Sequence, residues 1–275
     1  MFSLLKLSVP VCFAILPVAV RAGDPYVLPA GAAPSGMAFV SVMKKDFWSS
    51  VHNPGSLSYV RKTTFGTSCE NRFGIPGLGT VTAAAVIPVS RSSLGLDCSM
   101  FGNSDFRRQK ASLACGLPLG PAFSAGIRID YFSERTYGNY SNIGYVTFET
   151  GAVIRISNTV NAGIHIFNPL PSSLRKRPMA TVLSTGMGAE IGTGLFIGSE
   201  CEISTGGGAE LRTGFEYELS KRLWIRGGYK TGHSSFCFGL GYKTGPAVAD
   251  VSFTTHERLG ITSSVSLTFN INRPK

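Results

Sequence analysis

The stretch YVTFETGAVIRI, residues 145–156, shows the pattern that decides the fold. Its even positions hold Val, Phe, Thr, Ala, Ile and Ile, whereas its odd positions include Thr147, Glu149 and Arg155. Alternation over about ten residues has the period of a β-strand and not of a helix. The same pattern returns in residues 124–131 and 261–271. The sequence therefore predicts strands with one apolar and one polar face.

Fourteen stretches after about residue 61 are candidate strands. They span residues 63–73, 80–90, 93–101, 107–117, 122–133, 144–156, 159–167, 180–191, 194–204, 208–219, 222–231, 235–243, 246–256 and 260–271. One stretch is ambiguous, because residues 210–223 place leucine and phenylalanine at a spacing that also suits a helix. Gly214, the aromatic residues and the neighbouring strands favour a strand there.

The connections between these strands alternate in length. Links from even to odd strands are tight, as at Arg91-Ser92 and Thr244-Gly245, whereas several links from odd to even strands are longer. An even strand count with alternating short and long connections is typical of a barrel in the bacterial outer membrane. The predicted fold is therefore all-β, an antiparallel transmembrane β-barrel of fourteen strands with a short N-terminal plug.

Composition supports this class. Only 15% of the 275 residues are charged, against about 25% in a typical soluble domain. The 33 glycines argue against a coiled coil, and the 18 phenylalanines and 9 tyrosines argue against disorder. After the first twenty or so residues no apolar run is long enough for a membrane-spanning helix. A β-barrel carries its hydrophobicity on alternate positions instead.

The first segment, MFSLLKLSVPVCFAILPVAVRA at 1–22, predicts a secretory signal peptide. Its removal takes away Lys6 and Arg21, which leaves 24 basic and 16 acidic residues and a charge of +8. Export argues against a nucleic-acid partner. We expect a plug over residues 23–60, a barrel over 61–275, and an integral location in the cell outer membrane.

Nearly every charge within a predicted strand falls on one face, which we expect to line the lumen, because a cation at mid-membrane facing lipid costs about 2–4 kcal/mol. The proposed lumen-lining residues are Glu70, Arg72, Arg128, Asp130, Glu149, Arg155, Arg212, Glu216 and Arg226. Two interpretations stay open. Either these charges form a structural ion-pair network in a narrow lumen, or they select a polar solute. Both signs occur together, which favours the first.

Within the expected plug, part of 37–51 has the pattern of a short helix that Asn53-Pro54-Gly55 would end. The proposed plug or gating residues are Asp46, Trp48, His52, Asn53, Pro54 and Gly55. For the turn we weigh an anchoring role against gating, and for Trp48 packing against ligand binding.

These plug residues, with ENRFG at 70–74, GIRIDYFS at 126–133 and LWIRGGY at 223–229, resemble a small branch of the FadL-like outer-membrane family. That family includes long-chain fatty acid transporters and an outer-membrane protein of the type IX secretion system. The resemblance implies a plugged barrel in contact with outer-membrane lipid and lipopolysaccharide, inserted by the barrel assembly machinery.

Other chemistry receives little support. The cysteines show no zinc-site spacing; Cys98 and Cys115 could form a disulfide across one hairpin, although free thiols fit better. No hydrolase, metalloprotease or P-loop motif occurs, so we expect no enzyme, metal or cofactor.

Three hypotheses remain. The first is passive uptake of a small hydrophobic or amphipathic molecule, which a gap in the wall at the glycine-rich strands near Gly186, Gly188 and Gly206 would support. The second is a non-transporting outer-membrane interaction protein with a secretion or surface-protein partner. The third, a barrel enzyme acting on lipid, ranks last.

Overall fold

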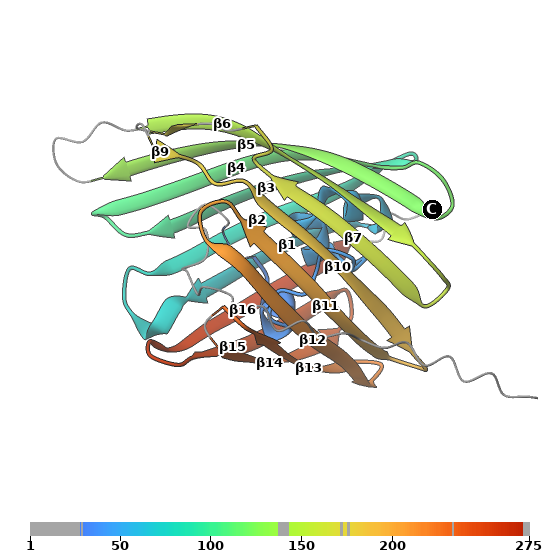
Figure 1. Cartoon of the computed structure of the whole chain (residues 1–275). Helices are drawn as coiled ribbons and strands as arrows, with labels where there is room; N and C mark the ends of the chain where they lie inside the picture. The colour runs from blue at the N-terminus through green and yellow to red at the C-terminus, as the bar shows by residue number, and fades with distance from the viewer. Residues whose placement is uncertain are drawn as a thin grey trace, which may run out of the picture.

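A computed structural model shows that the chain forms a closed antiparallel β-barrel, with fourteen strands among the described residues (Figure 1). The structure describes residue 28 and residues 30–136, 143–170, 173–174, 177–232 and 234–271. Barrel strands that follow one another along the chain pair with one another, and β1 pairs with β16 to close the cylinder. The predicted barrel and its strand number are therefore confirmed. The predicted signal peptide at 1–22 lies outside the described residues.

The alternating pattern located the strands well, because each one begins and ends within three residues of its expected bounds. The barrel strands are β1 (Thr63–Asn71), β2 (Gly79–Val89), β3 (Ser92–Gly102), β4 (Phe106–Pro118), β5 (Phe123–Thr136), β6 (Ile143–Arg155), β7 (Val160–Phe167), β10 (Val182–Ile191), β11 (Leu195–Ser204), β12 (Gly208–Ser220), β13 (Leu223–Lys230), β14 (Ser235–Thr244), β15 (Ala247–His256) and β16 (Gly260–Ile271). The ambiguous stretch is strand β12. A two-residue pair, β8 (Ser173–Leu174) and β9 (Arg177–Pro178), lies in the connection from β7 to β10 and was not predicted.

The two faces of the wall differ as the alternation predicts. Outward side chains such as Ile129, Val146 and Leu113 are large, apolar and about half exposed, whereas inward neighbours such as Arg128 and Asp130 are buried. A closed barrel satisfies every backbone hydrogen bond within its own ladder, and its apolar outer band then faces lipid. The wall is therefore built to span a membrane. None of the helices in the described ranges is long and apolar enough to cross one.

The barrel has two distinct ends. Connections such as β2 to β3 and β14 to β15 are tight, and together they form what we call the short-turn end. The opposite, long-loop end holds η2 (Arg72–Gly74) and the connection from β7 to β10. The start of β1 pairs with the end of β16, Thr63 opposite Ile271, so both ends of the barrel sequence lie at the short-turn end.

Residues 30–60, which we call the plug, lie inside the barrel and are drawn in blue in Figure 1. They form α1 (Ala32–Gly36), α2 (Phe47–His52) and η1 (Pro54–Tyr59). The Asp46 side chain caps α2 by accepting the Ser49 amide proton at 2.8 Å. The short helix expected within 37–51 thus begins only at Phe47, since the backbone before Asp46 turns repeatedly against the wall.

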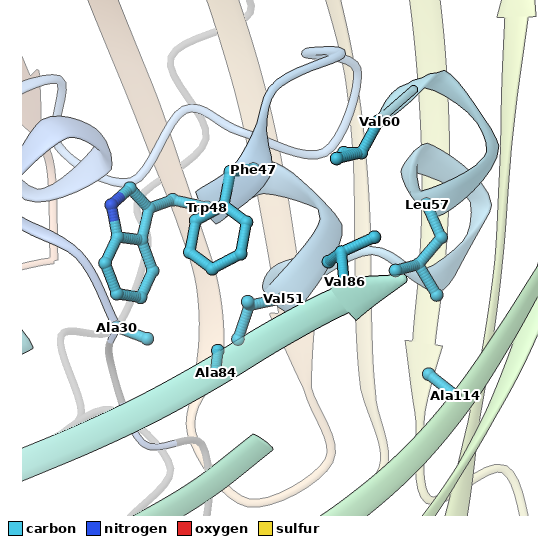
Figure 2. Packing of buried hydrophobic residues seen from close by; sticks show 9 residues of the cluster. All are labelled: Ala30, Phe47, Trp48, Val51, Leu57, Val60, Ala84, Val86 and Ala114. Atoms are coloured by element: carbon cyan, nitrogen blue, oxygen red, sulfur yellow. The ribbon is translucent and has the colours of Figure 1, made fainter. Parts of the chain in front are cut away.

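Apolar side chains of the plug pack against one sector of the inner wall (Figure 2). Phe47, Trp48 and Leu57 are buried from the plug side, and small wall residues of β2 and β4, among them Ala84 and Ala114, receive them. Each large apolar side chain buried in this way contributes about 1.5–3 kcal/mol. Much of the free energy that holds the plug therefore comes from this sector.

Candidate functional site

A row of inward-facing glycines carries the plug around the rest of the wall, and we call this row the glycine seat. Its members are Gly116, Gly126, Gly151, Gly163, Gly186, Gly198, Gly214 and Gly228, from β4 to β7 and β10 to β13. Gly198, Gly214 and Gly228 are direct cross-strand partners. A Cβ added at Gly214 would lie 2.5 Å from the Met37 carbonyl oxygen, and one at Gly228 would lie 2.6 Å from the Met37 carbonyl carbon. The plug backbone therefore lies directly on the wall backbone.

This seat corrects the expectation of a wall gap. Gly186 and Gly188 keep their cross-strand pairing with both β7 and β11, and both face Met43 of the plug. Gly206 lies in the turn before β12 and not in the wall. Glycine weakens a strand on its own, but here it makes room for a second backbone.

Two buried wall charges hold the plug by its backbone. The Glu200 carboxylate accepts the amide protons of Ser41 and Val42, each at 2.9 Å. On the other side of the lumen the Arg128 guanidinium donates to the carbonyls of Ser50, at 2.9 Å, and Val51. Carbonyls at the end of a helix lack partners within it, and a cation there also meets the negative end of the helix dipole. These two residues therefore satisfy plug groups that would otherwise stay unpaired.

Asn53, Pro54 and Gly55 form a turn docked tightly against β5, β6 and β7. The fully buried Asn53 amide donates to the carbonyls of Val42 at 2.6 Å and Ala152 at 3.3 Å, and its oxygen accepts the Gly55 amide proton at 2.9 Å. A Cβ at Gly55 would lie 2.7 Å from the Ala152 Cα. The wall hydroxyl of Ser124 donates to the Gly55 carbonyl at 2.6 Å. This geometry suits an anchor, because any movement would break several buried bonds at once.

The first group of lumen charges forms a buried network over β3 to β7. Glu149 lies at its centre, 3.1 Å from Arg128 and 3.2 Å from Lys110. His165 contacts the same carboxylate at 3.0 Å, and Lys110 also lies 3.4 Å from Asp130. Cations and anions occur side by side within this cluster, and Arg128 also lies 3.6 Å from Asp97. It therefore fills the lumen instead of presenting one sign of charge to a solute.

The second group lies over β11 to β15. Arg226 contacts Glu216 at 2.6 Å and Asp250 at 2.7 Å, and Lys44 of the plug joins Glu216 at 2.8 Å. Next to it, Arg212 contacts Glu202 at 2.7 Å and Glu210 at 2.5 Å. Lys44 thereby ties the plug to this side of the lumen by charge as well as by shape.

Two proposed lumen residues lie elsewhere. Arg155 ends β6 at the short-turn end, where its side chain is exposed and donates to the Pro121 carbonyl at 2.6 Å. Arg72 follows β1 in η2 and contacts the buried Glu70 at 3.0 Å, near the long-loop mouth. Alternation assigns a face only inside a strand, and both arginines stand where a strand ends. Arg155 therefore lies at the short-turn mouth of the barrel, opposite Asn161 of β7.

His52 links the two parts of the plug. Its Nδ1 lies 2.9 Å from the Ser41 hydroxyl, and its ring packs edge-on against Phe39 at 5.7 Å between centroids. Burial, assisted by the nearby Arg128 charge, lowers the pKa of His52 to about 4. The imidazole is therefore neutral at physiological pH.

Several residues of this site were not predicted from the sequence. Glu200, Ser124 and Lys44 were not proposed, although inward glycines on successive strands could have indicated a close backbone approach. All five cysteines from Cys69 to Cys237 are free, so the disulfide between Cys98 and Cys115 is wrong. Register explains this, because Cys115 lies opposite Leu94 and Cys98 lies opposite Ala111.

No protein-family model and no curated protein matches the chain. Several solved structures, however, have a similar fold. The Pseudomonas putida toluene transporter TodX superposes with a TM-score of 0.70 at 11% identity, covering 92% of this chain and 100% of that one. A Pseudomonas aeruginosa FadL homologue gives 0.66 at 12% identity, covering 90% and 99%, and the Ralstonia pickettii toluene transporter TbuX gives 0.65 at 10%, covering 88% and 98%. The likeness shows a shared fold, that of FadL-like integral outer-membrane barrels.

Proposed function

We propose that this chain is an outer-membrane barrel for passive uptake of a small hydrophobic or amphipathic molecule. The observation that supports this most is a plug built into the lumen of a barrel whose fold is shared with toluene transporters. By the usual orientation of such barrels, the short-turn end faces the periplasm and the long-loop end faces outward. The molecule would enter from the long-loop end.

The chemistry of the lumen favours an amphipathic cargo over a plain hydrocarbon. Beside the charge networks, the inner wall of β15, β16, β1 and β2 presents a sector of hydroxyls. Its members are Ser252, Thr254, Thr262, Ser264, Ser266, Thr268, Thr64, Ser68, Thr80 and Thr82. The hydroxyls of Thr80 and Ser252 are buried and have no hydrogen-bond partner among the described residues. A molecule with one polar group could use such hydroxyls along its path.

The test compares the mature chain with a variant lacking residues 23–58, each purified and placed in a planar lipid bilayer. We expect the deletion to open a steady conductance that the mature chain lacks, because the plug then no longer fills the lumen. Liposomes carrying each form should also take up toluene or a short-chain alcohol faster than protein-free liposomes. If folded protein of both forms stays closed and transports neither probe, uptake is excluded.

A second function is an outer-membrane interaction protein that transports nothing. The tight glycine seat and the paired lumen charges favour it, because both keep the lumen filled. Capture of a secretion or surface protein from outer membranes by the closed barrel would support it. Neither function includes a catalytic step. Contacts with lipopolysaccharide and the barrel assembly machinery belong to both.

A further inference from the structure

The net positive charge of the described chain lies at the short-turn end of the barrel. The described acidic residues at this end are Glu190 and Glu218. The lumen and the long-loop end hold basic and acidic residues in about equal numbers, so the excess of cations belongs to one mouth. The basic residues at this mouth are Lys45, Arg61, Lys62, Arg91, Arg155, Lys221, Arg222 and Lys243.

The wall presents cations to the opening from two sides. On one side Arg155, the last residue of β6, continues the inward-facing row of Glu149 and Val153. On the other side Lys243 continues the inward-facing row of β14, and its amide donates to the Arg222 carbonyl at 2.8 Å. Because alternate residues of a strand share a face, these cations surround the mouth instead of facing the lipid outside the wall.

The plug adds a recessed cation to this mouth. Lys45 Nζ donates to Asn161 Oδ1 at 2.5 Å and lies 4.6 Å from the centre of the Tyr59 ring. Arg155 is the cross-strand partner of Asn161, so two cations lie around one amide side chain. Burial and the nearby Arg155 charge lower the pKa of Lys45, and Glu190 offsets this only in part. The seam between plug and wall therefore holds two like charges together.

None of these basic residues forms an ion pair with another residue in the described ranges, in contrast to the lumen charges around Glu149 and Arg226. Like charges that are kept together repel one another and destabilise the folded chain. Cations of one sign around an opening also focus the electric field there and attract anions. The short-turn mouth therefore has the electrostatic properties of a docking surface for negative charge.

We propose that the short-turn mouth is a docking surface for an acidic polypeptide segment of a periplasmic protein. The cations stand on different sides of one opening and at the seam with the plug. A ligand with several carboxylates can contact many of them at once, whereas a single lipid headgroup reaches only a few and lies beside the outer wall. Arginine binds a carboxylate through two parallel hydrogen bonds. The periplasmic side follows from the usual orientation of such barrels, and the proposal holds whether or not the barrel transports a molecule.

Fluorescence anisotropy of labelled peptides with the mature protein in phosphatidylcholine nanodiscs tests the charge requirement. The probes are two peptides of about ten repeats each, one of Glu-Gly and one of Gln-Gly. We expect only the Glu-Gly peptide to bind, because the Gln-Gly peptide has the same length without the negative charges. Raising sodium chloride from about 50 to about 300 mM should weaken this binding several-fold by screening. Equal binding of both peptides, or binding of neither, would overturn the proposal.

Two double variants locate the surface. Lys45→Gln/Arg155→Gln removes the cations at the seam, and Arg222→Gln/Lys243→Gln removes the pair at β13 and β14. Each should weaken binding of the Glu-Gly peptide about ten-fold, which is about three-fold for each cation. The second pair belongs to the wall, so its effect does not depend on how firmly the plug is docked. Heat-dependent migration in gels verifies that each variant is folded.

The matched control is Arg107→Gln/Arg135→Gln, which removes two exposed cations that are cross-strand partners at the long-loop end. It should bind the Glu-Gly peptide like the unmodified protein, and an equal loss in this control would overturn the proposal. Native mass spectrometry with phosphatidylglycerol examines the lipid alternative. If the unmodified protein binds this lipid but not the peptide, and Arg222→Gln/Lys243→Gln loses the lipid, the cations serve headgroups and not a polypeptide.

Discussion

The inner wall holds the plug in two different ways on its two sides. On β12 and β13 the plug backbone rests on Gly214 and Gly228, with no room for a Cβ. On β2 and β4 the side chains of Phe47 and Leu57 pack against small apolar wall residues. Backbone contact gives little apolar burial but tolerates almost no change of shape, whereas side-chain packing gives burial and can adjust. One side therefore sets where the plug sits, and the other supplies most of the free energy that keeps it there.

The largest effect should come from breaking the seat. Gly214→Ala together with Gly228→Ala places two methyl groups against the Met37 backbone. Overpacking costs about 2 kcal/mol at each site, so the double variant should weaken plug docking by about 4 kcal/mol in total. Faster proteolysis of the plug in folded barrels would measure it. Gly120→Ala is the matched control, since open space surrounds that glycine. Equal protection of all three proteins would show that the seat is not tight.

A cavity on the β2 and β4 side, where plug side chains pack against the wall, should reduce the free energy of plug docking somewhat less. Leu57→Ala leaves a cavity against Gly95 and Ala114 and should destabilise plug docking by about 3 kcal/mol, in the usual range for a buried leucine. Urea titration that follows Trp48 fluorescence reports plug release. A midpoint unchanged from that of the parent protein would mean that this sector contributes little.

Acid should weaken both sides together, through His52. Its folded pKa of about 4 lies below the ordinary value of 6.5, so the neutral ring stabilises the folded state. That contribution is complete above about pH 6.5 and is lost as the pH falls toward 4, which amounts to about 2 kcal/mol by pH 4.5. Between pH 6.5 and pH 4, the free energy of plug release should depend more steeply on pH in the parent protein than in the variant His52→Asn. Parallel profiles would contradict the assignment.

A conservative substitution on the packed side should have the smallest effect. Leu57→Met keeps nearly the same volume and should cost less than about 1.5 kcal/mol, because a flexible side chain can refill the packed sector. The equally small addition of one methyl group at Gly214 should cost more. If the methionine variant is the more damaging of the two, the assignment of a rigid and an adaptable side is reversed.

Most of the wall could be predicted from the sequence. A strand with one face toward lipid and one toward the lumen has apolar and polar residues that alternate over about a dozen positions. Residues 145–156 gave the correct face for Val146 and Glu149 without any knowledge of their partners. Strand ends are different. Arg155 follows the inward parity, yet it lies where the strand ends, and its side chain donates to the Pro121 carbonyl in the neighbouring short turn.

The plug site could be predicted only in part. The turn signal Asn53-Pro54-Gly55 is visible within three residues, and it placed the end of α2 correctly. The contacts of Glu200 with Ser41 and of Arg128 with Ser50 join residues far apart in the chain, and no local pattern encodes them. The glycines carried a signal, but without the plug in place it suggested weakness in the wall and not a fitted surface.

The amide of Ala32 donates to the hydroxyl of Ser266, 234 positions further along the chain. The plug is therefore made first, yet it touches the strand that is made last, the same strand whose pairing with β1 seals the cylinder. The plug directly precedes β1 in the chain. The strands from β1 to β15 must therefore enclose the plug before β16 can pair with β1 and close the barrel. Contacts at such sequence separation make folding slow. The contact between Ala32 and Ser266 can therefore form only when the last strand has reached its place beside β1.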